Sequence, residues 1–100
     1  MRFLKGLFNR ETPGKRLERV ALDKMDELDV SQTQVNFVLG QPANIDLMVR
    51  MLSPDLEESE RALTEFKALP GTQQAIVAAG LANYTNYINN PGLDDLEPVL

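Results

Sequence analysis

The chain has 100 residues, of which 43% are apolar and 25% are charged. This is the composition of one globular domain rather than of a disordered chain. It contains no histidine, no cysteine and no tryptophan. Their absence excludes thiol nucleophiles, serine–histidine–aspartate relays, structural zinc sites and disulfide frameworks.

The net charge of −5 is unevenly distributed along the chain. Residues 1–24 carry seven basic and three acidic side chains, whereas residues 25–100 carry three basic and twelve acidic ones. This asymmetry indicates a basic arm that binds an anionic partner, or ends that neutralise each other within one fold or between copies. We therefore divide the chain into a basic amphipathic N-terminal arm, a helical bundle and an acidic-apolar tail, over residues 1–12, 13–90 and 91–100.

Neither an export signal nor a membrane-spanning segment is expected. The longest run of apolar or small residues, 75–82, is far shorter than the ~20 residues of a membrane helix. The N-terminus begins like a signal peptide, but Lys5 interrupts it and Asn9 and Arg10 end it too early. Without a signal or cysteines, we expect a cytoplasmic protein.

Turn residues divide the chain into segments with helical periodicity. The first helix is predicted to begin at Pro13 with Thr12 as its cap. Its apolar stripe is formed by Leu17, Val20, Ala21, Met25 and Leu28.

A short helix is predicted over residues 32–39, capped by Ser31 and closed by Gly40 in a left-handed conformation. A strand is the alternative for this segment, but nothing else in the chain offers it a partner. The next helix, Ala43 to Leu52, is apolar on nearly every side, which predicts a place at the centre of the bundle.

Ser53 and Pro54 are predicted to cap and begin a further helix with an acidic first turn. Its buried stripe comprises Leu56, Leu63, Phe66 and Leu69, with Ala62 beside it. The last helix is predicted over residues 73–88 with Thr72 as cap, and its small residues allow a neighbour to approach closely. Together these segments predict an all-α bundle of about five helices with short turns, with an additional amphipathic helix at the N-terminus as an option.

No catalytic residue, metal ligand or cofactor-binding residue is expected. The acidic clusters lie at helix ends and in the tail, where solvated charge explains them, and no phosphate-binding or dinucleotide-binding motif is present. Paired-carboxylate catalysis would need two such groups facing each other across a cleft. We therefore expect a protein that is not an enzyme.

A short pattern around the second predicted helix points to DNA. It comprises Leu28, Val30, Ser31, Gln32, Val35, Val38 and Leu39. This pattern resembles the turn and second helix of the helix-turn-helix in LacI-type repressors, which implies a reading helix over residues 32–39. However, Asp29 stands where that turn normally has glycine, and no basic residue lies between Lys24 and Arg50. Because phosphate contacts supply much of DNA affinity, a nucleic-acid partner is not the expectation, and DNA binding is kept as an alternative.

The arm has the pattern of a basic amphipathic helix. Phe3, Leu4, Leu7 and Phe8 would share one face, with three basic side chains around it. Such a helix can fill a groove of another protein, lie on a membrane surface or dock on its own bundle. With so few basic residues, membrane binding would be weak.

The last helix has an uncharged face with two tyrosines. Tyr84 and Tyr87 lie beside three asparagines in a stretch without charge from Gln73 to Asn90. Interface cores favour tyrosine and exclude charge. The alternative is that Tyr84 is core and the asparagines are solvated.

These observations predict a non-enzymatic protein–protein interaction module. We expect a small intracellular adaptor or regulatory protein whose partner is another protein or a second copy of itself. The predicted binding residues are Phe3, Leu4, Leu7, Phe8, Tyr84 and Tyr87. The alternatives are a helix-turn-helix DNA-binding regulator and a peripheral membrane protein anchored by residues 1–10.

Overall fold

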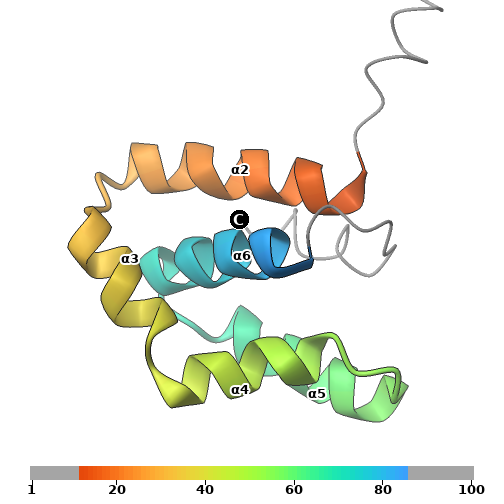
Figure 1. The fold of residues 1–100 in the computed structure, drawn as a ribbon. Helices are drawn as coiled ribbons and strands as arrows, with labels where there is room; N and C mark the ends of the chain where they lie inside the picture. The colour runs from red at the N-terminus through yellow and green to blue at the C-terminus, as the bar shows by residue number, and fades with distance from the viewer. Residues whose placement is uncertain (1–11, 86–100) are drawn as a thin grey trace, which may run out of the picture.

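The computed structural model describes residues 12–85, which form five α-helices (Figure 1). In chain order they are α2 (Pro13–Glu27), α3 (Gln32–Leu39), α4 (Pro42–Met51), α5 (Leu56–Lys67) and α6 (Gly71–Thr85). No strand occurs within this range, so the predicted all-α bundle is confirmed and the strand alternative for residues 32–39 is wrong. The proposed extra N-terminal helix and the acidic-apolar tail lie outside the described residues.

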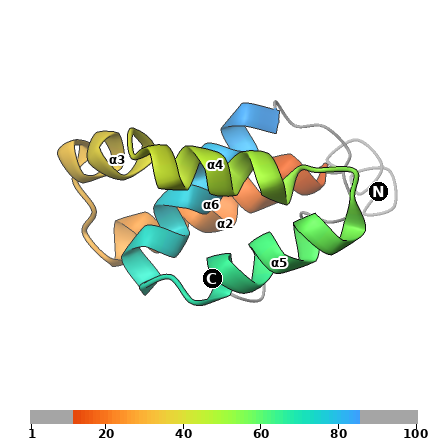
Figure 2. The same ribbon diagram turned by 90° about the horizontal axis from the view of Figure 1, so that it is seen from below.

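The helices form three layers, and α6 is the middle layer. Figure 1 shows α2 on one side of α6 and the pair α4 and α5 on the other, while α3 connects the two sides. Seen from below in Figure 2, α4 and α5 lie side by side across the bundle. Because α6 lies between the other layers, it is the helix that loses most contact with water.

The prediction that the helix over residues 43–52 is central is therefore wrong. In α4 the side chain of Leu47 is buried, whereas Ile45 and Val49 are exposed. The α6 core residues, by contrast, are Ala75, Ile76, Val77, Ala78, Leu81 and Ala82. The physical reason is charge: Asp46 and Arg50 hold one side of α4 at the surface, while α6 has no charged side chain.

Most helix starts follow from local hydrogen bonds. Thr12 Oγ1 accepts from Lys15 N at 3.2 Å, and Pro13 takes the first helical position, as predicted. Ser31 caps α3 and forms a reciprocal pair with Gln34, whose Oε1 accepts from Ser31 N at 2.8 Å. These caps satisfy amide groups that have no partner inside the helix.

The start of α5 differs from the prediction. Asp55, rather than Ser53, is the cap, and its carboxylate accepts from the backbone amides of Glu57 and Glu58. Pro54 therefore lies before the helix, and Ser53 Oγ accepts from Asp55 N at 3.1 Å. A carboxylate caps a helix as well as a hydroxyl does and also complements the helix dipole.

Two further corrections concern apolar residues at helix ends. Leu56 was expected in the buried stripe of α5 but is 74% exposed at the first position of that helix. Leu28 was expected in the stripe of the first helix but is 39% exposed, because it is the residue that ends α2. Periodicity extends a stripe to the end of a segment, whereas burial needs a neighbouring helix at that point.

The last helix begins at Gly71, earlier than the predicted cap at Thr72. As predicted, its small residues permit close packing. A Cβ placed on Gly80 would lie 2.5 Å from Leu39 Cδ2 and 3.4 Å from Met48 Sδ. The side chains of Leu39 on α3 and Met48 on α4 therefore lie against the backbone of α6, in space that a side chain at position 80 would occupy.

Gly40 does not adopt the predicted left-handed conformation. Its φ is −85°, whereas Asp29 has a φ of 57°. Helix α3 ends at Leu39 with Gly40 as its C-cap. The chain becomes extended at Gln41, which precedes Pro42, as residues before proline prefer. Asn44 Nδ2 donates to Val38 O at 2.9 Å and so satisfies a carbonyl at the end of α3.

Candidate interaction surface

The predicted binding residues lie almost entirely outside the described part of the chain. Phe3, Leu4, Leu7 and Phe8 of the arm are outside it, and so is Tyr87. Tyr84 lies in the last turn of α6, and its side chain is outside the described residues. That these residues form one site stays a prediction.

Within residues 12–85, four of the six large apolar residues that are exposed lie on α3, on α4 and at the start of α5, and the other two, Leu22 and Leu28, lie on α2 and at its end. Phe37 on α3 is 68% exposed and Val49 on α4 is 56% exposed. Ile45 is exposed one helical turn before Val49, so the two share one face of α4. Isolated exposed apolar residues are ordinary, but two of them on one face of a helix, next to a hollow, are a candidate binding surface.

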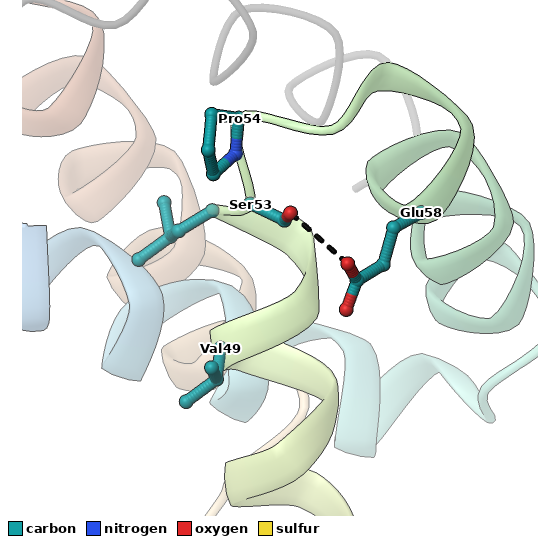
Figure 3. A pocket seen from close by; sticks show the side chains of 5 residues that line it. Val49, Ser53, Pro54 and Glu58 are labelled. Atoms are coloured by element: carbon teal, nitrogen blue, oxygen red, sulfur yellow. Dashed lines mark hydrogen bonds between the residues drawn. The ribbon is translucent and has the colours of Figure 1, made fainter.

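That hollow lies where α4 ends and the chain turns into α5 (Figure 3). It has a volume of about 380 Å³ and is lined by Val49, Leu52, Ser53, Pro54 and Glu58. Ser53 Oγ donates to the Glu58 carboxylate at 3.1 Å, which holds this carboxylate against the end of α4. We call Ile45 together with these five residues the α4 surface.

The α4 surface combines apolar groups with negative charge. Val49, Leu52 and Pro54 supply apolar walls, and Glu58 supplies a carboxylate. Among these lining residues only Ser53 has a hydrogen-bond donor in its side chain. Its neutral hydroxyl does not neutralise the charge of Glu58. An apolar segment with basic side chains would complement it.

The neighbouring cation, Arg50, is already engaged. Its Nε donates to Asp46 Oδ2 at 2.8 Å, and its two terminal nitrogens donate to the carboxylate of Glu65 on α5. The hydrogen bonds from Arg50 lower the pKa of Glu65, and the same contacts with Glu65 and Asp46 raise the pKa of Arg50. This network connects α4 to α5, and both carboxylates are bound to Arg50.

The segment that resembles a helix-turn-helix has part of the expected geometry. Asp29 is in the left-handed region at the position where the LacI-type turn normally has glycine. Gln32, Gln34 and Asn36 are exposed, but Gln32 Nε2 donates to Asn36 Oδ1 at 3.0 Å and Gln34 is used in the cap of α3. These polar side chains therefore have structural partners within α3.

Sequence reasoning missed two features of the described residues. Gln74 is buried, and its Nε2 donates to Phe66 O at 3.2 Å and Lys67 O at 2.8 Å, which joins the end of α5 to α6. Nothing in the sequence pattern distinguishes Gln74 from Gln73. The exposed face of α4 was visible as an excess of apolar residues, but it was interpreted as the centre of the bundle.

No group of three or more acidic side chains among residues 12–85 is arranged to hold a metal ion. None of the helices within that range is both long and apolar enough to cross a membrane. No protein-family model matches the sequence, and no match was found among the curated proteins or the solved structures.

Proposed function

We propose that this chain is a non-enzymatic protein–protein interaction module, a small cytoplasmic adaptor or regulatory protein that associates with copies of itself. The observation that carries the proposal is the α4 surface, where Ile45 and Val49 remain exposed beside an acidic hollow. Apolar surface in contact with water is stabilised when a partner covers it. The apolar face of the arm and the Tyr84/Tyr87 face are the other surfaces that we assign to binding.

The test is the absolute molar mass of the full chain, measured by size-exclusion chromatography with light scattering over a range of concentrations. We expect a multiple of 11.2 kDa for the unmodified chain and 11.2 kDa for the variant with Leu7→Ser and Phe8→Ser. Leu22→Ser is the matched control, because Leu22 is an exposed apolar residue on α2. If the arm variant keeps the mass of the unmodified chain and only unfolds at a lower temperature, the arm is core and its assignment to binding is wrong. A mass of 11.2 kDa for the unmodified chain at every concentration would overturn the proposed self-association.

A DNA-binding regulator is the second candidate, and the left-handed Asp29 in a LacI-type turn is the observation that favours it. Against it, Arg50 is held by two carboxylates, and no other basic residue lies between Lys24 and Arg61. A duplex at low ionic strength would be retarded in a gel, and the affinity would fall steeply as salt rises. A chain that leaves every duplex unshifted at low salt is not a DNA reader.

A further inference from the structure

We propose that the N-terminal arm of one copy binds the α4 surface of a second copy, so that two chains exchange their arms. This inference rests on the self-association proposed above and names the surface that receives the arm. It is carried by three properties of the described residues: the spacing of the exposed apolar groups, the charge around them and the position of α4 relative to α2.

The apolar spacing of the two partners is the same. Ile45 and Val49 are separated by one helical turn on the exposed face of α4. In the arm, Phe3 and Leu7 have the same separation, and Leu4 and Phe8 repeat it. Two helices can therefore align apolar groups along one line of contact. The hollow beyond Val49 extends this line and is large enough to hold a phenyl ring.

The charges are also complementary. From α4 to α5, residues 42–67 carry six acidic and three basic side chains. Arg50 binds two of these acids, Asp46 and Glu65, which leaves four acidic side chains against Arg61 and Lys67. The arm carries three basic residues and one acidic residue. The acidic part of a second copy, residues 25–100, would be repelled by this charge, whereas the basic arm would be attracted to it.

The position of α4 favours the arm of another copy over the chain's own arm. Phe8 lies four residues before Thr12, and four residues span at most about 14 Å when fully extended. A helical arm would be shorter still, at about 1.5 Å per residue. Helix α6 separates α2 from α4 (Figure 1), and packed helix axes lie about 8–10 Å apart, which places α4 about 16–20 Å from α2. A helical arm therefore covers Val49 of a second copy more readily than Val49 of its own chain.

The first test uses two variants of the full chain that add the same charge at matched positions. Val49 is 56% exposed on α4, and Leu22 is 50% exposed on α2, so lysine at either position leaves the core intact. We expect Val49→Lys to raise the dissociation constant of the dimer by about tenfold or more, because a lysine would be buried beside basic residues of the arm. Leu22→Lys should leave it unchanged, and circular dichroism of both variants checks that they fold.

The second test uses the absence of cysteine from the chain. Two differently tagged samples, one with Phe8→Cys and one with Val49→Cys, are mixed and exposed to a mild oxidant. We expect a disulfide-linked pair that contains one chain of each kind. The control mixture of Phe8→Cys with Leu22→Cys should give much less of it.

The outcomes separate this inference from the proposed function. If the unmodified chain is a monomer at every concentration, both are wrong. If it self-associates and the arm variant abolishes this, but Val49→Lys does not, the self-association stands on the arm and the α4 surface is not the receptor. Equal cross-linking to Val49→Cys and Leu22→Cys would also overturn the inference.

Discussion

Replacing Gly80 with alanine tests the packing of α6 against α3 and α4. The new Cβ would lie 2.5 Å from Leu39 Cδ2, 3.3 Å from Leu39 Cδ1 and 3.4 Å from Met48 Sδ. Carbon atoms in contact are normally about 3.5–4 Å apart. The end of the Leu39 side chain must therefore move by about 1 Å, while Met48 needs only a small adjustment.

Two opposing effects decide the change in stability. Alanine in a helix interior is favoured over glycine by about 1 kcal/mol. Adding a methyl group to a filled site costs about 1–3 kcal/mol through displaced side chains. We expect Gly80→Ala to lower the free energy of unfolding by up to about 2 kcal/mol, with the contact to Leu39 outweighing the gain in helix propensity.

The decisive result is whether the effect of Gly80→Ala on the free energy of unfolding changes sign when Leu39 is alanine. With Leu39→Ala already present, the clashing atoms are gone and Gly80→Ala should raise the free energy of unfolding by about 1 kcal/mol. The four chains of this double-mutant cycle are compared by urea denaturation at one protein concentration, because self-association would make stability depend on concentration. A full gain of about 1 kcal/mol from Gly80→Ala alone, with no coupling to Leu39, would refute the close approach of α3 and α6.

Three further predictions use single sites. Gln74→Ala should lower the free energy of unfolding by about 1–3 kcal/mol, because two carbonyls at the end of α5 lose a buried donor; Gln73→Ala is the control. Asp29→Gly should raise it by about 0.5–1 kcal/mol in the same denaturation assay, since glycine adopts a positive φ without strain, and a loss of stability would contradict this. The pKa of Glu65 is lowered in the folded chain by Arg50, so its contribution to stability is complete above about pH 4.5 and is lost as pH falls through the folded pKa. Thermal melts should therefore show a shallower loss of stability on acidification for Arg50→Gln than for the unmodified chain; equal slopes would argue against the ion pair.

The local features of the fold could be read from the sequence. Thr12 and Ser31 cap helices because each accepts a hydrogen bond from an amide three residues later, which requires no distant contact. The same local reasoning placed the breaks between helices to within one or two residues for most of the described chain. It erred at Ser53 because Ser53 and Asp55 can both act as caps, and in the structure the Asp55 carboxylate accepts from the first amides of α5.

The candidate site was less predictable. The arm and the tyrosine face were chosen from composition and remain predictions. The α4 surface was not predicted, because an apolar helix looks the same in sequence whether its second face is buried or exposed. Only the positions of its neighbours show that Ile45 and Val49 stay exposed.

The sequence by itself determined the all-α class, the approximate helix boundaries and the chemistry that a chain without histidine or cysteine cannot perform. The tertiary structure decided which helix is central, which face of α4 stays in contact with water and which residue takes a positive φ. The physical reason is the distance along the chain over which each effect acts. Caps, prolines and periodicity act within one or two helical turns, whereas burial depends on several helices together. Gly80 shows the difference, since its small size is visible in the sequence but its contact with Leu39 on α3 exists only in the fold.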